Sequence, residues 1–376
     1  MSDNGFIRLA LPYMDQDELN EIKGVLASGY LTQGPKVAEF EEMVRAKVGT
    51  KYAFAMSSCT TALHLSLVVL GVGPGDEVLV PDFTFPATAN VVVQQGATPV
   101  LVDIDLDTFA IDVEDAARKV TPRTKAIMPM HPFGLSADMD AVLVLAKKHG
   151  LKVVEDAATA IGTTYKGRFC GSIGDLGCFS FHPRKVITTG EGGMVMTNGS
   201  KLAERIGLLR SHGGVRVGNR YQYRAAGYNY RLSDVLGAIG VAQMRKLDAL
   251  IAHKRDLAAQ LTEKLAVIDG VKAPQEPAWD GHIYQSYVVL LDEDINRDRV
   301  IAAMREQGIE TTLGTYALHV QPFFMKEYGY SEGDLPNSYR AYRQALTLPL
   351  YPPMGVAKLE RIAKALAQAL GSSKRA

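Results

Sequence analysis

Several short segments of the chain carry residue types that could act together on one small ligand. Lys185 stands in FSFHPRKVITTGEGG, between an apolar run and a glycine-rich turn. Asp156 ends the apolar run LKVVED, where a carboxylate is costly unless it is paired or hydrogen-bonded. Phe85 follows the run EVLVP, and small hydroxyl residues follow the run KYAFAM in MSSCTT. Each feature also has a structural explanation: a solvated lysine, helix N-caps for the aspartate and hydroxyl residues, and core packing for the phenylalanine.

Taken together, these residue types meet the requirements of pyridoxal phosphate. The aldehyde of this cofactor forms a Schiff base with a lysine, and its pyridinium nitrogen needs a carboxylate partner. Its ring can stack on an aromatic side chain, and its phosphate can bind the N–H groups at a helix N-terminus. The matching residues are Lys185 for the aldehyde, Asp156 for the nitrogen, Phe85 for the ring, and Ser57, Ser58, Cys59, Thr60 and Ser180 for the phosphate.

Other kinds of ligand site have less support in the sequence. The eight histidines show no HExxH-like spacing, and the three cysteines, Cys59, Cys170 and Cys178, form no CxxC pair or zinc spacing. No GxGxxG or Walker pattern follows a predicted strand. We therefore predict no metal site.

The order of the predicted elements would bring the candidate residues together. Strands alternating with helices imply βαβ units and a largely parallel, buried sheet. In such sheets, ligands bind outside the carboxyl ends of the strands, where Ser57, Asp156 and the segment 180–185 are expected. The predicted strands are 50–56, 77–81, 98–105, 125–130, 151–156, 177–181 and 192–197, with helices at 60–72, 86–96 and 137–150.

The C-terminal part of the chain has a different pattern. A long helix is predicted at 237–268, then a strand at 282–291, a helix at 297–308, a strand at 309–313 and a last helix at 357–370. We predict a large domain over 1–245, with the N-terminal segment, and a small α+β domain over 246–376. The glycine- and asparagine-punctuated segment 214–232 is predicted as a loop.

Composition limits the classes of partner and the cellular compartment. Lys+Arg and Asp+Glu both number 41, so no overall charge favours nucleic acid or an acidic membrane. The N-terminus has no signal-peptide pattern, and no run resembles a membrane span. The odd cysteine count argues against a disulfide scaffold, so we expect a cytoplasmic protein that binds neither membrane nor nucleic acid.

Longer motifs resemble one known family over nearly the whole chain. They are LASGYLTQGPKVAEFE, FSFHPRKVITTGEGG, GYNYRLSDVLGAIGVAQM, LHVQPFF and LTLPLYP, and the second is highly specific. The chain is similar in these motifs to the DegT/DnrJ/EryC1/StrS family of pyridoxal-phosphate-dependent sugar aminotransferases. The resemblance implies a type I aminotransferase-like α/β fold with a mostly parallel sheet, a smaller C-terminal domain, and a homodimer with sites at the interface.

The resemblance also implies roles for individual residues. Lys185 would form the Schiff base, and Asp156 would pair with the pyridinium nitrogen. Asn229, in GYNYR, would reach the phosphate from the other subunit. Phe85 takes the ring-stacking position, Ser58, Cys59, Thr60 and Ser180 the phosphate positions, and Tyr30, Thr32, His182, Tyr316 and His319 lie in regions that line the sugar-nucleotide site.

Two positions depart from the pattern of the family. Thr159 stands at a cofactor-contacting position where relatives often have glutamine or histidine, so one contact there would be lost or mediated by water. Cys59 replaces a common glycine in the phosphate turn, which is tolerable if backbone N–H groups bind the phosphate.

The activity that the resemblance implies has two half-reactions. L-Glutamate would give its amino group and leave as 2-oxoglutarate, and the keto group of a nucleotide-linked deoxysugar would then receive the amino group. A sugar dehydratase or lyase that uses the same cofactor, and a non-catalytic regulatory homologue, remain alternatives. Lys185 argues against those dehydratases of the family that carry histidine at this position. The nucleotide, the sugar and the aminated carbon are not predicted.

Overall fold

A seven-stranded sheet forms the centre of the computed structural model, which describes residues 5–373. Only β10 runs antiparallel to its neighbours within this sheet, and the other strands are parallel to one another, as the strand–helix alternation predicts. In spatial order the strands are β1 (Tyr52–Met56), β10 (Gly193–Thr197), β9 (Leu176–Ser180), β6 (Lys152–Asp156), β5 (Thr124–Ile127), β2 (Glu77–Pro81) and β4 (Thr98–Val102).

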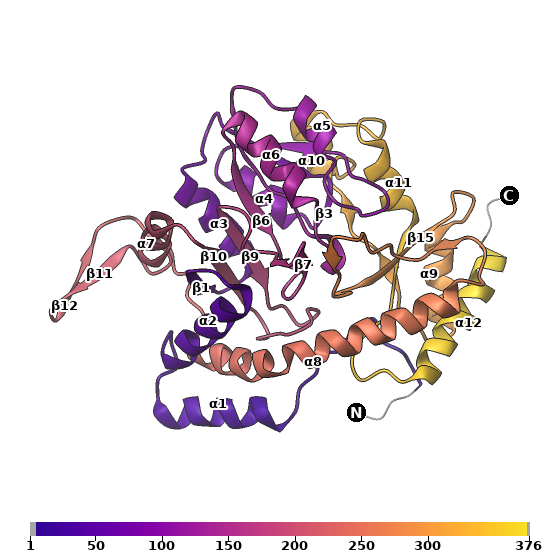
Figure 1. Cartoon of the computed structure of the whole chain (residues 1–376), viewed down its shortest axis with the longest axis horizontal. Helices are drawn as coiled ribbons and strands as arrows, with labels where there is room; N and C mark the ends of the chain where they lie inside the picture. Colours follow the sequence, from indigo (N-terminus) through magenta and orange to yellow (C-terminus); the bar gives the residue numbers. More distant parts are fainter. Residues whose placement is uncertain (1–4, 374–376) are drawn as a thin grey trace.

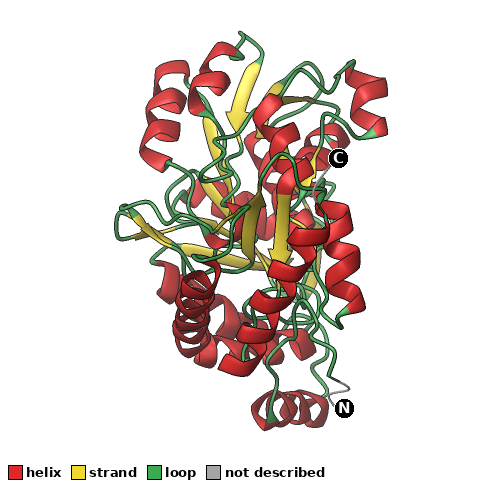
Figure 2. Ribbon diagram, turned by 90° about the vertical axis from the view of Figure 1, so that its right-hand side faces the viewer, coloured by secondary structure: helices red, strands yellow, loops and turns green. Residues whose placement is uncertain are grey.

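Helices cover both faces of the sheet, so its strands are apolar on both sides. Successive side chains of a strand point to opposite faces. Val153 accordingly joins one core cluster and Val154 the other. Figure 2 shows the strands inside and the helices around them. The first cluster includes α2 (Pro35–Val48), α6 (Met139–His149) and the first half of α8 (Asp234–Leu265), and the second includes α3 (Cys59–Leu70), α4 (Ala87–Gln94) and α7 (Ser200–Leu209).

A second, antiparallel sheet and its helices form a separate core near the C-terminus. Its strands, in spatial order, are β13 (Val271–Lys272), β15 (Tyr287–Leu291), β18 (Ala345–Leu348) and β16 (Thr312–Leu313). The helices α9 (Arg297–Glu306), α12 (Val356–Ser372) and the second half of α8 cover it. Figure 1 shows α8 running beneath both parts of the molecule.

The predicted domain boundary between residues 245 and 246 lies inside α8. Leu247 and Leu250 of this helix pack in the first core, whereas Leu257 and Leu261 pack in the C-terminal core. The helix is therefore shared between the two cores, and the division into 1–245 and 246–376 stays a prediction.

The N-terminal segment crosses to the C-terminal core before the first helix begins. Ile7 packs in that core, and its N–H donates to the Gly308 carbonyl at 2.8 Å. The Leu9 N–H donates to the Glu310 carboxylate at 3.0 Å. We call residues 5–13 the N-terminal strap, because they tie the start of the chain to residues 308–310.

The segment 214–232, predicted as a loop, contains a hairpin. Strands β11 (Gly214–Val217) and β12 (Arg220–Tyr223) pair antiparallel and project from the body of the molecule in Figure 1. The two residues between the strands, Gly218 and Asn219, make a tight turn, with φ of +58° at Gly218. Glycine and asparagine here mark a turn between two strands, so the loop prediction was wrong.

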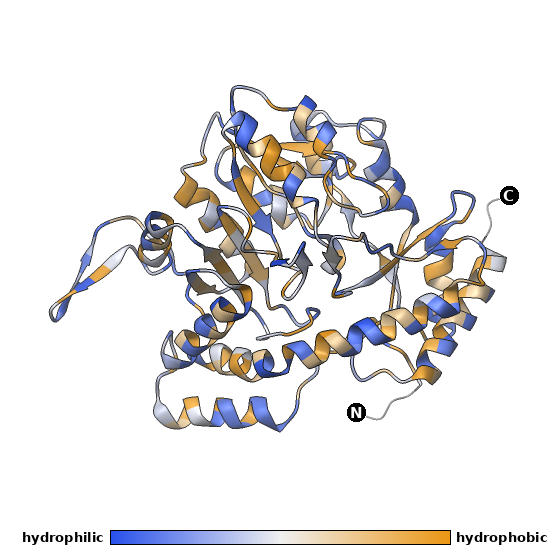
Figure 3. Cartoon of the chain, in the orientation of Figure 1, coloured by the Kyte–Doolittle hydropathy of each residue, from blue (hydrophilic) through white to orange (hydrophobic). Residues whose placement is uncertain are grey.

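Shorter elements complete the fold. They are α1 (Gln16–Ser28), β3 (Phe83–Thr84), α5 (Val113–Arg118), the 3-10 turn η1 (Pro132–Gly134), β7 (Thr164–Tyr165), β8 (Arg168–Phe169), β14 (Asp280–Gly281), β17 (Tyr316–Ala317), α10 (Pro322–Tyr328) and α11 (Pro336–Gln344). Figure 3 shows apolar residues concentrated in the central strands and polar residues along the outer helices. Within residues 5–373, no helix combines the length and apolarity that crossing a membrane requires.

Candidate functional site

The predicted catalytic and phosphate-binding residues meet at one edge of the central sheet. Register places Met56, Gly193 and Ser180 side by side on β1, β10 and β9. Asp156 ends the neighbouring strand β6, opposite Cys178 of β9. The segment that carries Lys185 begins directly after β9. Sequence-distant residues therefore converge because parallel strands end at the same edge, as predicted.

The first turn of α3 forms a cradle for an anion. Ser58 is its N-cap, and the Ser58 hydroxyl accepts the Thr61 N–H at 3.1 Å. The N–H groups of Cys59 and Thr60 belong to the first helical turn, where the helix itself offers no acceptor. The positive end of the helix dipole adds to their attraction for a negative charge.

Gly193 lets β10 approach this cradle closely. A Cβ atom at Gly193 would lie 2.4 Å from the carbonyl atoms of Ser58 and 2.5 Å from the Cys59 nitrogen. Such distances are too short for any side chain, so the glycine is required for the turn to rest against β10. Ser180, opposite Gly193, is buried, and its hydroxyl accepts a long bond of 3.4 Å from the His182 N–H.

Asp156 is a buried carboxylate held in a fixed orientation. The Thr88 hydroxyl donates to Oδ2 at 2.7 Å, and the Ala158 N–H donates to Oδ1 at 3.2 Å. Burial raises the pKa of Asp156, while these two hydrogen bonds and the positive charge of Lys185 act in the opposite direction. A protonated ring nitrogen would supply the partner that this buried carboxylate needs. Sequence reasoning missed Thr88, because nothing in its local pattern distinguishes it from any helical threonine.

Lys185 is placed where its amine is easily deprotonated. Burial lowers the pKa of Lys185 from its usual value, and nearby Arg184 lowers it further, whereas Cys59 and Asp156 partly oppose the shift. These electrostatic neighbours show that the amine lies close to both the phosphate cradle and the buried carboxylate. A neutral amine is the form that can attack an aldehyde.

The thiol of Cys59 is not suited to act as a nucleophile. The side chain is buried, and burial together with Asp156 raises the pKa of the Cys59 thiol well above its usual value. A thiol in this state is not a nucleophile.

Phe85 and Thr159 lie beside the Asp156 network. The Phe85 carbonyl accepts the Thr88 N–H at 3.2 Å, and the Phe85 side chain is 65% exposed, so one apolar ring is open to a ligand. The Thr159 hydroxyl donates to the His131 carbonyl at 2.5 Å. This bond occupies the hydroxyl hydrogen of Thr159, and the loss of a cofactor contact at this position stays a prediction.

The residues predicted to line a sugar-nucleotide site are spread over several elements. Tyr30 and Thr32 are exposed after α1, and Asn229 is exposed beyond the β11–β12 hairpin. Tyr316 lies on β17 opposite Thr84 and is partly exposed. His182 is half-buried, and burial lowers its pKa.

His319, predicted to lie in a region that lines the sugar-nucleotide site, is held against the end of β2, and its contact with a ligand stays a prediction. Its side chain is fully buried, with ring Nδ1 2.6 Å from Oδ2 of Asp82. Its N–H donates to Oδ1 of the same carboxylate at 2.6 Å. The residue ties β17 and the following segment to the end of β2, while its ring Nε2 has no hydrogen-bond partner within residues 5–373.

Three buried residues, His131, Glu155 and Cys170, have side-chain atoms close enough to surround a metal ion. The Ala137 N–H donates to Nδ1 of His131, so Nε2 carries the proton and donates to Glu155 at 3.0 Å. Glu155 also accepts the N–H groups of Gly171, Ile173 and Gly174. These bonds occupy the side-chain atoms of His131 and Glu155 and fix the turn before β9.

The residues at the sheet edge fit pyridoxal phosphate. The α3 cradle provides unpaired N–H groups for the phosphate, Phe85 an open ring face, Asp156 a buried carboxylate and Lys185 an amine with a lowered pKa. Every part that the cofactor needs is thus present at the edge of one sheet.

Comparisons with known proteins agree with this arrangement. The model of the DegT/DnrJ/EryC1/StrS aminotransferase family matches residues 12–367. The chain is 40% identical over 364 residues to the spore coat polysaccharide biosynthesis protein SpsC of Bacillus subtilis, covering 93% of this chain and 94% of SpsC. It is 39% identical over 374 residues to GDP-perosamine synthase of Caulobacter vibrioides, covering 98% of this chain and 100% of the synthase.

Solved structures extend the likeness to cofactor-bound forms. Spr1654 of Streptococcus pneumoniae, in its PMP form, superposes with a TM-score of 0.94 at 27% identity, covering 98% of both chains. The PLP form of the same protein gives a TM-score of 0.93 at 27% identity, covering 98% of this chain and 99% of that one.

Proposed function

From the premise that this chain belongs to the DegT/DnrJ/EryC1/StrS aminotransferase family and is a pyridoxal-phosphate-dependent sugar aminotransferase, we propose a specific reaction. It transfers the amino group of L-glutamate to a keto group of a nucleotide-linked deoxysugar. The products are 2-oxoglutarate and an amino sugar nucleotide. The observation that carries the proposal is the convergence of Lys185, Asp156 and the α3 cradle at one edge of the sheet.

The side chains of this site divide the work between binding and proton transfer. Bound pyridoxal phosphate supplies an aldehyde that links covalently to amines and a ring that accepts the electron pair released at an amino-acid Cα. The N–H groups of Cys59 and Thr60 and the hydroxyl of Ser180 hold the phosphate. Phe85 covers one face of the ring.

Lys185 and Asp156 perform the steps that move charge. In its neutral form Lys185 would hold the cofactor covalently. Once an amino donor has taken its place, the free amine would remove the donor Cα proton and, as general acid, deliver it to the former aldehyde carbon of the cofactor. Asp156, fixed by Thr88, keeps the ring nitrogen protonated by pairing with its positive charge. Hydrolysis by a water molecule would release 2-oxoglutarate and leave the amino group on the cofactor, and the same residues would act in reverse on the keto sugar.

A nucleotide-linked acceptor is supported by the relatives. GDP-perosamine synthase is named for a nucleotide-linked amino sugar, and SpsC for polysaccharide biosynthesis. L-Glutamate as donor rests on the family resemblance.

A homodimer with shared sites is supported by the surface of the chain. Asn229, expected to reach a phosphate in the other subunit, is exposed. Tyr221 and Tyr223 on the nearby projecting hairpin are 63% and 72% exposed, as expected for side chains that a second subunit covers.

The experiment that tests the function combines absorbance with product analysis. Wild-type protein loaded with pyridoxal phosphate should show the visible band of the lysine-linked cofactor, and L-glutamate should convert this band to that of the amino form. Lys185→Ala should show neither band change nor turnover. Keto-sugar nucleotides should then yield a product that carries nitrogen on the sugar.

Other outcomes would point to the alternatives. A deoxygenated or dehydrated sugar without nitrogen would indicate a dehydratase or lyase. Cofactor binding without turnover of any keto sugar would favour a regulatory homologue. Turnover retained by Lys185→Ala would refute the role of this lysine.

A further inference from the structure

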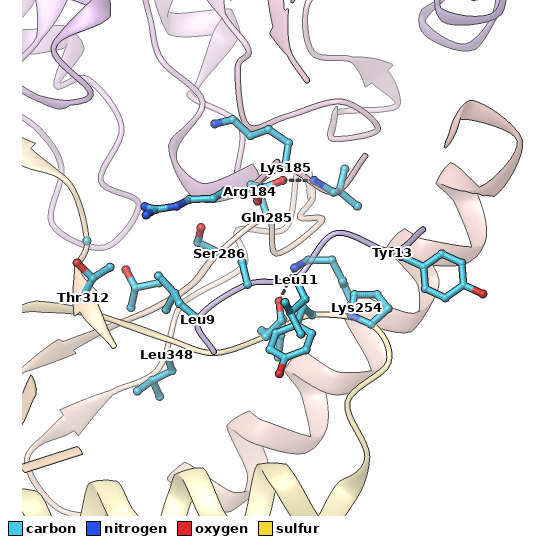
Figure 4. A pocket seen from close by; sticks show the side chains of 17 residues that line it. Leu9, Leu11, Tyr13, Arg184, Lys185, Lys254, Gln285, Ser286, Thr312 and Leu348 are labelled. Atoms are coloured by element: carbon cyan, nitrogen blue, oxygen red, sulfur yellow. Dashed lines mark hydrogen bonds between the residues drawn. The ribbon is translucent and has the colours of Figure 1, made fainter. Parts of the chain in front are cut away.

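The side-chain amide of Gln285 forms hydrogen bonds with the backbone on both sides of Lys185. Its Nε2 donates to the Arg184 carbonyl at 2.6 Å, and its Oε1 accepts the Val186 N–H at 2.7 Å. Figure 4 shows Gln285 directly beneath the Lys185 backbone, while the Lys185 side chain extends away from it. Gln285 is buried, so these bonds have little competition from water. The two peptide units that set the direction of the Lys185 side chain are therefore both held by one amide.

Gln285 is itself fixed by the turn η1. The Ile283 N–H donates to the Gly134 carbonyl at 3.1 Å, and the Ser286 N–H donates to the Phe133 carbonyl at 3.2 Å. A Cβ at Gly134 would lie 2.8 Å from the Gln285 nitrogen, so the two segments are in the closest contact that backbone allows.

The segment that leads into η1 also holds Asp156. The Asp156 N–H donates to the Pro129 carbonyl at 2.9 Å, and the His131 N–H donates to the Asp156 carbonyl at 3.1 Å. A continuous path of hydrogen bonds and backbone thus runs from Asp156 through residues 129–134 to Gln285 and on to Lys185.

A second glutamine supports the same loop at a different point. Gln243 of α8 accepts the Thr188 N–H at 3.1 Å and donates to the Tyr13 carbonyl at 2.8 Å. It is buried like Gln285, but its hydrogen bonds within residues 5–373 go to Thr188, Tyr13, Met14 and Glu18 rather than to the peptide units of Lys185. Gln243 therefore offers a matched control for loss of loop support in general.

We propose that Gln285 is a positioning residue, whose two hydrogen bonds hold the Lys185 amine in a fixed position relative to Asp156. The inference rests on the proposed function, in which Lys185 links to the cofactor and then moves a proton. With both flanking peptide units fixed, the direction of the Cα–Cβ bond of Lys185 is fixed, and only side-chain rotations remain to be ordered. Loss of these two hydrogen bonds would leave substrate binding intact and slow the steps that depend on the Lys185 amine.

The test compares Gln285→Met with Gln243→Met in the full-length protein. Each change removes a buried amide at similar volume. We expect Gln285→Met to slow the growth of the lysine-linked cofactor band, after pyridoxal phosphate is added to cofactor-free protein, by about tenfold. The kcat should fall by a similar factor with KM changed by less than about twofold, because uniform substrate binding is unaffected. Gln243→Met should change either rate by less than about threefold.

A third variant, Gln285→Glu, separates positioning from loop stability through pH. When ionised, the introduced carboxylate repels the Arg184 carbonyl, whereas the protonated acid can donate to this carbonyl and still accept the Val186 N–H. The linkage rate of the variant relative to wild type should therefore recover as pH falls. A ratio that does not change with pH would overturn the proposal, as would equal effects of Gln285→Met and Gln243→Met.

Two further results keep the outcome decisive. If Gln285→Met does not fold, hydrogen exchange of the wild-type protein tests the proposal instead. The Val186 amide should be protected from exchange. Exchange at the rate of an exposed loop would overturn the proposed hydrogen bonding by Gln285. If wild-type protein shows no lysine-linked band at all, the proposed function fails instead. Normal wild-type linkage with an unaffected Gln285→Met variant refutes only the role of Gln285.

Discussion

Replacing Lys254 by methionine should remove a pH dependence from the stability of the fold. Lys254 lies on the shared helix α8 and is 3% exposed. Within residues 5–373, its amine donates only to the Leu350 carbonyl, at 2.7 Å. It borders the cavity of about 130 Å³ beneath the Lys185 loop that Figure 4 shows. Burial lowers the pKa of Lys254 from 10.5 to about 7.

The sign of the effect follows from the protons bound in each state. Between pH 7 and pH 10.5, the unfolded chain keeps a proton on Lys254 that the folded chain has lost. The unfolded state then binds more protons, so the free energy of unfolding rises with pH across this window. At ~1.4 kcal/mol for each pH unit between the two pKa values, the full effect is on the order of 5 kcal/mol. Below pH 7 both states are protonated, and the whole destabilisation by the buried charge is present.

The assay is chemical denaturation of wild type and Lys254→Met, at saturating pyridoxal phosphate and at steps from about pH 6 to about pH 10. The variant loses the bond to Leu350, which shifts its stability equally at every pH. The free energy of unfolding of wild type minus that of the variant should rise by a few kcal/mol over this range. Lys201→Met, which changes an exposed lysine on α7, should reproduce the wild-type dependence. Parallel curves for wild type and Lys254→Met would refute the reasoning.

Two further predictions concern the cofactor site. Gly193→Ala should weaken pyridoxal phosphate binding by at least about tenfold, because the added Cβ would displace the Ser58–Cys59 peptide by roughly 1 Å. Titration of cofactor-free protein with pyridoxal phosphate measures this affinity. The control variant Gly24→Ala, whose added Cβ has no atom within 4 Å, should bind the cofactor normally. Mixing inactive Lys185→Ala with inactive Asn229→Ala should restore activity at up to about a quarter of the sites, because a mixed dimer has one intact site. Mixtures that stay inactive, although mass spectrometry finds mixed dimers, would contradict a shared site.

The architecture could be predicted from the sequence because its signals are local. The alternation of apolar strands and helices between residues 50 and 200 gave the parallel sheet, and the strand ends gave the convergence of Asp156 and the segment of Lys185. The antiparallel direction of β10 could not be predicted, since a buried strand looks the same in either direction. The hairpin at 214–223 was missed because its Gly–Asn turn was interpreted as loop punctuation.

The supporting residues of the site could not be predicted, and the reason is their dependence on long-range contacts. Thr88 is hydrogen-bonded to Asp156, 68 residues away in the sequence, and Gln285 is hydrogen-bonded to Val186, 99 residues away. Gly193 is needed only because α3 begins against it. His319 was assigned to a ligand site by resemblance, and its burial against Asp82 follows from the pairing of β17 with β3. No local sequence pattern predicts contacts between residues so far apart in the chain.

The N-terminal strap has a consequence for how the protein is made. Leu9 finds its partner Glu310 301 residues later in the chain, and Ile7 packs in a core that is made mostly of C-terminal residues. At a synthesis rate of ~5–20 residues per second, the strap emerges about 15 to 60 seconds before its partner exists. The central sheet can form during this interval, but the N-terminal strap cannot yet pack against residues 308–310 and the C-terminal core. We therefore expect residues 5–13 to dock late in folding, after residues 308–310 have been synthesised.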